Sequence, residues 1–387
     1  MRLLVAVPSW VGDAAMATPA LRLLRSRLHG SFIGGLVRPG IDQVLAGTDF
    51  FDQLHVERAR GVMGPKVLAA RVRPLRYDTA LLLTNSFSSA LVARLAFIPR
   101  RVGYDRDGRG VLLTDKLEPA RRARPHKGFA PMPAVDYYLA AAHALLGERE
   151  SKGASPALSP PALELAVTDQ EQHAAAEILA KGGAAQLLDP GGLGEAQLFA
   201  ILNPGGNNPA KRWPADRFAE IGARLVREHR MSVLINGSPA EAELVAEIAD
   251  CIRAKLGSAD TGTASAPPIL ELPKLGITIG ALKALIHRAG GDGGILVTND
   301  TGPRHLAAAF RVPTVSLFGP TDPRWTTLPG PPSPTWEHPR KPSSPREVVL
   351  VSDPTLPPEE VADDHPERCR VDRIEVKAVW RAVESLL

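Results

Sequence analysis

A repeated alternation of apolar strands and helices constrains this chain more than any other feature. Residues 2–7 (RLLVAV) form a continuous apolar run, which is typical of a parallel strand buried on both faces. Residues 31–37 and 79–85 repeat the strand signal, and residues 67–75 between them are predicted to be helical. The first strand leads into another helix, which Pro19 is expected to kink near its start.

The alternation starts again in the second half of the chain. The predicted strands there are 198–203, 231–236, 295–299 and 313–318, and the predicted helices are 169–183, 214–229, 239–256, 303–310 and 375–387. Residues 151–163, rich in Ser, Pro, Gly and Ala, are interpreted as a linker, and the proline-rich residues 329–368 are predicted to be irregular. The fold class is therefore α/β, with two doubly wound domains expected to face each other across a cleft.

Length and composition agree with this organisation. The 387 residues suit two domains, and two cysteines exclude a disulfide framework or a four-cysteine zinc site. The net charge of +4 suits an anionic ligand or a membrane surface but requires neither. Because no stretch of 18 apolar residues occurs, we expect a cytoplasmic protein that is at most peripheral to a membrane.

Ligands of doubly wound sheets bind beyond the carboxyl ends of the strands, so the loops at these ends are the candidate sites. The first such loop contains Ser9, Trp10 and Asp13. Its single glycine does not match the G-x-G-x-x-G pattern of dinucleotide-binding enzymes, which argues against hydride transfer. From spacing alone, Asp13 is either the N-cap of the following helix or a general base.

The second loop, residues 203–214 (NPGGNNPAKRWP), combines flexible backbone with positive charge. Gly205 and Gly206 allow close approach of an anion, and Lys211 precedes a helix whose amino end attracts negative charge. The loop is not a Walker A motif, since no Gly precedes the lysine and no Ser or Thr follows it. Phosphate binding is favoured over a merely solvated surface loop.

Two more loops in the second half extend this pattern. In residues 298–309 the candidate ligand contacts are Asn299, Asp300, Thr301, Gly302 and His305. The histidine is expected on an exposed or cleft-facing side of its helix, although a packed histidine is the alternative. Gly237 and Ser238 precede another helix, where Glu241 either compensates the helix dipole or binds a ribose. Together these loops suggest a nucleotide diphosphate ligand.

The motifs PSWVGDAAMATPAL, PGGNNPAKRWP and TNDTGPRHLAAAFRVPTVSLFGPTDPRWT resemble those of the ADP-heptose:lipopolysaccharide heptosyltransferases, glycosyltransferase family 9. Residues 85–115 are similar to the heptosyltransferase II branch. The resemblance runs from residue 1 to about 328. It implies a GT-B fold with an acceptor domain (1–165), a nucleotide-sugar domain (166–365) and a last segment (366–387) that packs back on the acceptor domain.

The resemblance also implies a reaction: inverting transfer of heptose from ADP-L-glycero-D-manno-heptose to the inner core of lipopolysaccharide. No cofactor or metal is required, and no nucleic acid takes part. Asp13 matches the general base, Lys211 the lysine that neutralises the diphosphate, and Leu275 a position near the adenine. The remaining donor contacts are Gly205, Gly206, Gly237, Ser238, Glu241, Asn299, Asp300, Thr301, Gly302 and His305. The expected acceptor contacts are Ser9, Trp10, Asn85, Ser86, Ser88 and Arg101.

Other readings stay open at this stage. The chain is also compatible with a relative that uses another nucleotide sugar, with a non-catalytic binding protein, or with an epimerase on the same fold. Intact Asp13 and Lys211 favour a transferase. Arg304 departs from the family pattern and is expected either to contact phosphate or to point to solvent. The expected partners are an ADP-sugar and a lipid-linked acceptor, with the protein a monomer in peripheral contact with the inner membrane.

Overall fold

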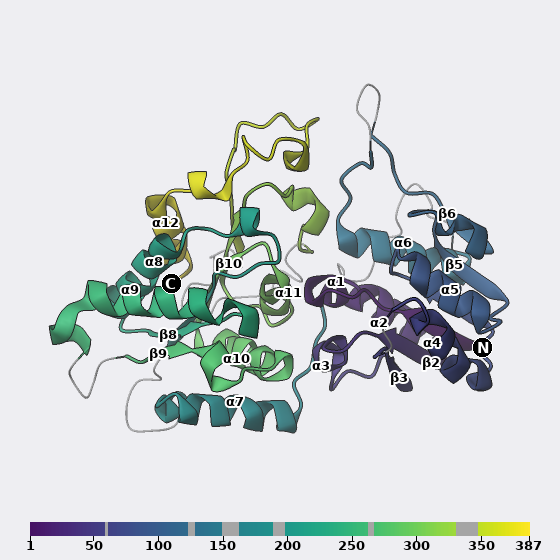
Figure 1. The fold of residues 1–387 in the computed structure, drawn as a ribbon, viewed down its shortest axis with the longest axis horizontal. Helices are drawn as coiled ribbons and strands as arrows, with labels where there is room; N and C mark the ends of the chain where they lie inside the picture. Colours follow the sequence, from purple (N-terminus) through teal and green to yellow (C-terminus); the bar gives the residue numbers. More distant parts are fainter. Residues whose placement is uncertain (59–60, 123–127, 149–161, 189–197, 262–266, 330–346) are drawn as a thin grey trace. The chain divides into compact units, whose positions relative to one another are not determined.

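The computed structural model describes residues 1–58, 61–122, 128–148, 162–188, 198–261, 267–329 and 347–387 (Figure 1). The chain divides into two compact units. The first unit comprises the described residues within 1–166 and 324–329, and the second comprises those within 167–323 and 347–387. Each unit contains a six-stranded sheet whose paired strands all run parallel. Of the predicted linker 151–163, only residues 162 and 163 lie within the described residues.

The sheet of the first unit has the strand order β3-β2-β1-β4-β5-β6. Its strands are β1 (Arg2–Ala6), β2 (Phe32–Val37), β3 (Gln53–Val56), β4 (Thr79–Leu82), β5 (Arg100–Tyr104) and β6 (Asp115–Leu117). Its helices are α1 (Val11–Met16), α2 (Thr18–Arg27), α3 (Ile41–Leu45), α4 (Gly64–Val72), α5 (Phe87–Leu95) and α6 (Ala134–Leu146), with 3-10 turns η1 (Arg73–Leu75) and η2 (Arg109–Leu112). The order reverses between the neighbours β1 and β4, which makes this the switch point where such sheets bind ligands.

The first helix is interrupted as predicted. Helix α1 ends at Met16 and α2 begins at Thr18, with Pro19 in the first turn of α2. Proline is tolerated there because the first turn leaves its amide positions without an intrahelical partner.

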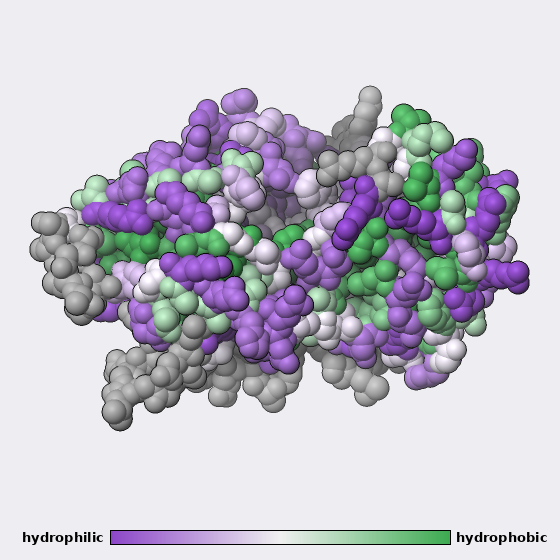
Figure 2. Space-filling view, turned by 60° about the horizontal axis from the view of Figure 1, so that its bottom comes forward, coloured by the Kyte–Doolittle hydropathy of each residue, from purple (hydrophilic) through white to green (hydrophobic). Residues whose placement is uncertain are grey.

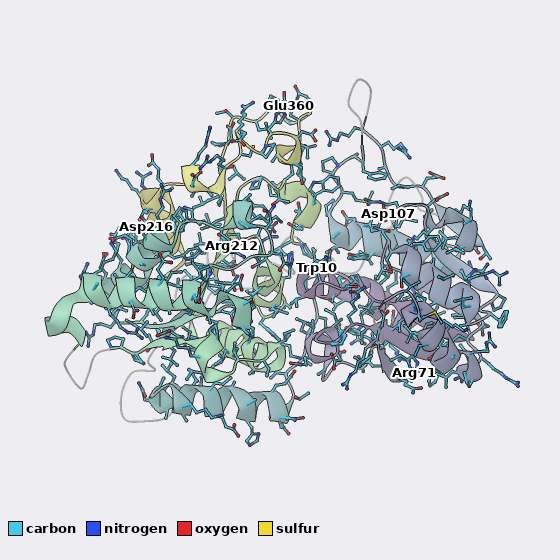
Figure 3. All side chains as sticks on the ribbon, viewed as in Figure 1. Trp10, Arg71, Asp107, Arg212, Asp216 and Glu360 are labelled. Atoms are coloured by element: carbon cyan, nitrogen blue, oxygen red, sulfur yellow. The ribbon has the colours of Figure 1, made fainter. Side chains whose placement is uncertain are left out.

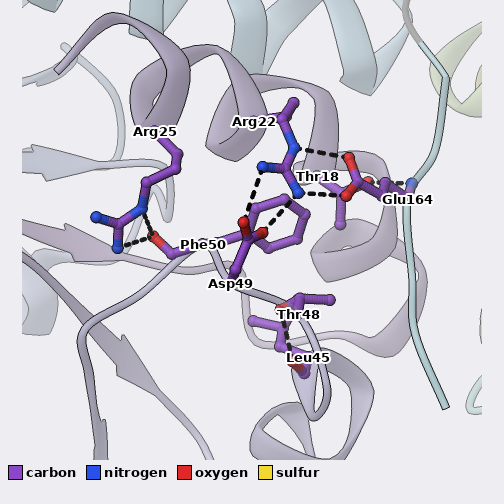
Figure 4. Close-up of polar contacts among 8 residues, drawn as sticks. All are labelled: Thr18, Arg22, Arg25, Leu45, Thr48, Asp49, Phe50 and Glu164. Atoms are coloured by element: carbon purple, nitrogen blue, oxygen red, sulfur yellow. Dashed lines mark hydrogen bonds and ion pairs between the residues drawn. The ribbon is translucent and has the colours of Figure 1, made fainter. Parts of the chain in front are cut away.

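Residues 162–166 belong to the first unit because they are tied to α2 (Figure 4). The Arg22 guanidinium binds Glu164 and also lies 2.6 Å from Asp49 Oδ1, and the Glu164 amide donates to Thr18 Oγ1 at 3.0 Å. The hydrogen bonds that Arg22 donates to Glu164 and then to Asp49 raise the pKa of Arg22. These contacts of Glu164 with Arg22 and Thr18 hold residues 162–166 on the first unit, which ends at residue 166. The boundary expected from the sequence was residue 165.

The sheet of the second unit has the order β12-β11-β10-β7-β8-β9. Its strands are β7 (Phe199–Asn203), β8 (Ser232–Ile235), β9 (Ile269–Glu271), β10 (Ile295–Asn299), β11 (Thr314–Phe318) and β12 (Glu347–Val351). Its helices are α7 (Asp169–Lys181), α8 (Ala215–His229), α9 (Ala242–Thr261), α10 (Ile279–Asp292), α11 (Gly302–Ala309) and α12 (Val376–Leu386). Its short 3-10 turns include η4 (Pro209–Lys211), η5 (Pro239–Glu241), η6 (Leu272–Leu275) and η9 (Val371–Arg373). The switch point lies between β7 and β10, so the loops after these two strands lie side by side.

Two expectations about the end of the chain need correction. Residues 347–351 of the supposedly irregular region form strand β12, which pairs with β11. The last helix belongs to the second unit: Trp380 and Val383 of α12 pack in the same core as α8, and Trp213 Nε1 donates to Ile374 O at 2.9 Å. Its apolar face is therefore buried within the second unit, in place of the expected packing on the acceptor domain.

Candidate functional site

The switch point of the second unit is lined by asparagines that end neighbouring strands. Asn203 ends β7 and Asn236 follows β8. Asn236 Nδ2 donates to Asn203 Oδ1 at 2.6 Å, and Asn203 Nδ2 donates to Thr298 Oγ1 at 3.0 Å and to Thr301 Oγ1 at 2.7 Å. This buried network fixes the carboxyl edge of β8, β7 and β10. Sequence reasoning missed Asn203 and Asn236, although an Asn directly after each apolar strand was a visible signal.

Asn299 anchors the glycine-containing loop instead of facing a ligand. The side chain is fully buried at the end of β10. Its Nδ2 donates to Pro204 O at 2.7 Å and to Gly205 O at 3.3 Å, while its Oδ1 accepts the Trp213 amide at 3.2 Å. Because Asn299 forms hydrogen bonds with both ends of the loop, it is a positioning residue. A contact of Asn299 with the donor stays a prediction.

Glu241 holds the glycine loop against the amino end of η5. Its Oε1 accepts the Gly206 amide at 2.8 Å, and its Oε2 accepts the Ser238 amide and hydroxyl, both at 2.8 Å. A Cβ added to Gly205 would lie 2.5 Å from Glu241 Oε1, so the contact requires glycine there. Burial alone would raise the pKa of Glu241, but the bonds from Ser238 and Gly206 hold it below the usual value. Ser238 and Glu241 thus form a capping box that also fixes the loop.

Gly237 and Leu275 lie beside this arrangement. A Cβ on Gly237 would come within 2.9 Å of Val245 Cγ2, so a larger residue would displace the loop from α9. Leu275 ends η6, is half-buried, and lies near Gly182, where an added Cβ would be 3.0 Å from its Cδ1. Contacts of both residues with a ligand stay predictions.

Lys211 and Asp300 form an ion pair at the switch point. Lys211 ends η4 on the loop after β7, and Asp300 follows β10. Lys211 Nζ lies 2.9 Å from Asp300 Oδ2, and the aspartate is 8% exposed. Burial raises the pKa of Asp300, but the Lys211 ammonium outweighs it and holds the pKa below the ordinary value. The lysine side chain is 25% exposed and keeps further N–H groups for a ligand. Arg212 beside it donates from Nε to Gly206 O at 2.8 Å (Figure 3).

The amino end of α11 lies next to this ion pair in the chain. Thr301 is the N-cap and Gly302 the first helical residue. Pro303 has no N–H and the Arg304 amide donates to Thr301 O at 3.2 Å, so the amides of Thr301 and Gly302 are those that this helix end can offer to an anion. His305 is 3% exposed, contrary to the expectation of an exposed or cleft-facing side. Burial, and then the charge of Arg304, lower its pKa to about 3, so it is neutral at pH 7. Its Nδ1 has no hydrogen-bond partner among the described residues.

Arg304 neither points to solvent nor extends toward a phosphate. It is 1% exposed, its Nε lies 2.5 Å from Glu347 Oε1, and its guanidinium lies 4.9 Å from the centre of the Phe318 ring. The departure from the family pattern is therefore matched by Glu347, the first residue of the unpredicted strand β12.

In the first unit, Asp13 is in the first turn of α1 and is not its N-cap. Trp10 is the N-cap and provides no side-chain bond, so the capping interpretation of Asp13 is wrong. Asp13 is half-buried, and its Oδ1 accepts a hydrogen bond of 3.1 Å from the Tyr138 hydroxyl. Trp10 is 63% exposed, and Ser9 is half-buried before it (Figure 3).

Tyr137 and Tyr138, consecutive residues of α6, contact both loops of this switch point. Burial, followed by the charge of Asp13, raises the pKa of Tyr138 well above its usual value, so its hydroxyl remains protonated. The Tyr137 hydroxyl donates to Asn85 Oδ1 at 2.9 Å, just beyond β4. Asn85 Oδ1 also lies 3.3 Å from a nitrogen of the buried Arg109. No local pattern pointed to these tyrosines, because they are far from the two loops along the chain.

The other residues expected to contact the acceptor have different places in the first unit. Ser86 is the N-cap of α5 and accepts the Ser89 amide at 3.2 Å, while Ser88 is half-buried in the first turn. Arg101 is the second residue of β5, at the opposite end of the strand from the switch-point edge. Its guanidinium donates to three backbone carbonyls, those of residues 98, 99 and 112. It therefore supports that edge of the sheet, and its contact with an acceptor stays a prediction.

The described residues contain neither a membrane-spanning helix nor a metal-binding cluster. No helix there is long and apolar enough to cross a membrane. No group of three or more His, Cys, Asp or Glu side chains in the described ranges is arranged to hold a metal ion.

Known proteins with similar sequences and structures identify the family and the fold. The family model described as glycosyltransferase family 9 (heptosyltransferase) matches residues 67–345. Lipopolysaccharide heptosyltransferase 2 of Salmonella typhimurium is 28% identical over 331 residues, 84% of this chain and 85% of the relative, and the Escherichia coli protein of the same name gives the same figures. The solved structure of E. coli ADP-heptose lps heptosyltransferase II matches with a TM-score of 0.71 at 24% identity, covering 100% of this chain and 98% of that one. E. coli heptosyltransferase WaaC with ADP-2-deoxy-2-fluoro heptose matches with a TM-score of 0.60 at 18% identity, over 99% of both chains. The two sheets thus form a GT-B fold, and the chain belongs to glycosyltransferase family 9, the heptosyltransferases, and is a glycosyltransferase.

Proposed function

We propose that this enzyme transfers heptose from ADP-L-glycero-D-manno-heptose to a lipid-linked lipopolysaccharide core acceptor, with inversion at the transferred carbon. The proposal is supported by family membership and by the relatives named lipopolysaccharide heptosyltransferase 2. The observation that carries the donor assignment is the Lys211–Asp300 ion pair at the switch point of the second unit, with the glycine loop and the amino end of α11 adjoining it in the chain.

On the donor side, Lys211 and the amide groups at the start of α11 bind the diphosphate. Asp300 orients the Lys211 ammonium through one N–H, so that the remaining N–H groups meet phosphate oxygens. As the bond between the sugar carbon and the phosphate oxygen breaks, negative charge grows on ADP. A preorganised lysine and helix end stabilise this charge in the transition state. Because these groups supply positive charge, we propose that no metal ion is required, so activity should survive addition of EDTA.

On the acceptor side, Asp13 is the general base. It removes the proton of the acceptor hydroxyl while that oxygen attacks the sugar carbon from the face opposite the leaving diphosphate. A single displacement of this kind inverts the configuration. Asn85, which follows β4 beside β1, provides an amide for the acceptor. Trp10, as the exposed aromatic next to α1, provides a surface for a sugar ring.

The test is a transfer assay with the purified full chain. ADP-heptose and other nucleotide sugars are each paired with defined core acceptors, and the product mass is measured. We expect a mass increase of one heptose with ADP-heptose. Transfer of a different sugar would assign another donor, and binding of ADP-heptose without any product would identify a non-catalytic binding protein.

A further inference from the structure

Helix α5 in the first unit leaves large apolar side chains on its outer face. Its alanines Ala90 and Ala93 are buried against the sheet. The larger Phe87 and Leu95 face outward, with exposures of 47% and 36%, and the half-exposed Leu91 lies between them at a spacing of four. Val92 is buried with these alanines, but the larger Phe87 and Leu95 stay exposed, so an apolar stripe of α5 faces away from the core of this unit.

Phe97, the second residue after α5, has a left-handed backbone conformation that residues of its kind rarely adopt. It has φ +60°, and the amide of Ile98 closes the helix by donating to Ala93 O at 3.1 Å. Gly or Asn normally occupies this left-handed position, and a bulky residue there is unusual. The ring is 63% exposed, so burial within the unit does not offset the strain.

Helix α4 packs beside α5 and continues the same surface. Val67 is 42% exposed on α4 and Met63, just before it, is 57% exposed. Arg73 joins the two helices: its guanidinium lies 4.2 Å from the centre of the Phe97 ring and donates to Leu95 O at 3.1 Å. Hydrophobic residues are exposed among hydrophilic ones over the first unit, on the right of Figure 2.

The charge of this surface has one sign. Residues 58–104 contain nine arginines and lysines and a single acidic residue, Asp78. Lys66, Arg71 and Arg94 are exposed on α4 and α5, with Arg71 labelled in Figure 3. Within the described parts of the chain, none of these three cations has an ion pair. We call the surface formed by Lys66, Val67, Arg71, Arg94, Leu95 and Phe97 the α4–α5 face.

We propose that the α4–α5 face docks on a bilayer surface that contains anionic lipids. Unpaired cations are attracted to lipid headgroups, and apolar side chains spaced between them enter the boundary between headgroups and acyl chains. An acidic protein partner would satisfy the cations, but it would not need large aliphatic and aromatic side chains distributed singly along two helices. This proposal goes beyond the transfer reaction and specifies how the enzyme reaches a lipid-linked acceptor.

The test is sedimentation of the full chain with vesicles. One vesicle type contains phosphatidylethanolamine and phosphatidylglycerol, and the other only neutral phosphatidylcholine. We expect binding to the anionic vesicles alone, weakened by salt. The variant Lys66→Glu/Arg71→Glu/Arg94→Glu should bind about a hundredfold more weakly, from roughly one kcal/mol per cation. The variant Phe97→Asn removes the ring but suits the left-handed backbone, so it should fold normally and bind several-fold more weakly.

A matched variant in the second unit, Arg373→Glu/Lys377→Glu/Arg381→Glu, changes the net charge equally and should retain binding. Both triple variants should transfer heptose to a water-soluble acceptor fragment at the normal rate, which separates this proposal from the proposed function. Equal loss of vesicle binding in both triple variants would show that the net charge of the protein, and not the α4–α5 face, determines binding. This result would overturn the proposal. Equal binding to neutral vesicles, or binding unaffected by the α4–α5 changes, would also overturn it.

Discussion

The two sheets carry their functional residues in different ways at equivalent places. At the switch point of the second unit, the polar side chains are bonded to one another: Asn299 is fully buried and fixes the loop, and Lys211 is paired with Asp300. At the switch point of the first unit, Trp10 is 63% exposed, and the bond from Tyr138 holds a half-buried Asp13.

This difference fits the two kinds of substrate in the proposed function. A small, highly charged donor is best met by groups already fixed in position, because reorganisation then costs little during the reaction. A large acceptor needs an open surface and only one precisely held reactive group. If this comparison holds, changes at the first switch point should affect turnover, and changes at the second should affect binding of the diphosphate.

The largest effect is expected from Asp13→Asn. Removal of a general base lowers kcat by about a thousandfold, within the range usual for such groups. Because the donor groups lie in the second unit, the Kd of ADP should be unchanged by isothermal titration. Asp107→Asn, an exposed residue of the same unit, is the matched control and should retain activity. Parallel loss of turnover and of ADP affinity would show that Asp13 has a structural role.

Next in size is the effect of Lys211→Met on the donor side. Loss of a charged hydrogen bond to the diphosphate should weaken ADP binding by roughly tenfold to a hundredfold, while adenosine binding should not change. Lys255→Met, which removes an exposed ion pair with Glu220, is the control. If ADP and adenosine were affected equally, the contact of Lys211 with the diphosphate would be ruled out.

The sequence predicted much of the second unit's site because its signals are local. A glycine pair with a lysine before a helix, and an acidic residue after a strand, identify loops at a sheet edge without knowledge of their neighbours. It did not predict Asn203 or Asn299 as positioning residues, since their partners lie on other strands. Strand β12 was missed because it follows a proline-rich region, and with it the partner of Arg304.

The first unit shows more clearly that local sequence patterns do not predict contacts between distant parts of the chain. The strand and the helix around Asp13 were predictable from apolar periodicity, and Pro19 explained the break between α1 and α2. Tyr138, 125 residues away along the chain, was not predictable, because no local pattern indicates which side chain of a distant helix reaches a loop. The charge of Arg101 was visible in the sequence, whereas its place at the end of β5 away from the switch point was not.

A smaller effect concerns the stability of the second unit. The pKa of His305 is lowered to about 3 by burial and by Arg304, below the value of about 6.5 in the unfolded chain. Between these values the unfolded state binds the proton and the folded state does not, so stability is present above pH 6.5 and is lost as the pH falls. At pH 5 the loss should be about 2 kcal/mol in urea unfolding. His305→Gln should remove this part of the pH dependence, and an unchanged slope would contradict the buried neutral histidine.

The smallest effect isolates the one hydrogen bond that Tyr138 gives to the proposed base. Donation to a carboxylate favours its charged form, so Tyr138→Phe should move the acidic limb of the kcat/KM profile upward. Above that limb, activity should fall only a few-fold, because the base remains in place. Tyr77→Phe, which removes a buried hydroxyl bonded to His55 Nε2 at 2.7 Å in the same unit, should leave the limb unmoved. A uniform loss of activity at every pH would mean that Tyr138 only supports the fold, whereas a shifted limb would show that the open acceptor side still fixes its one reactive group.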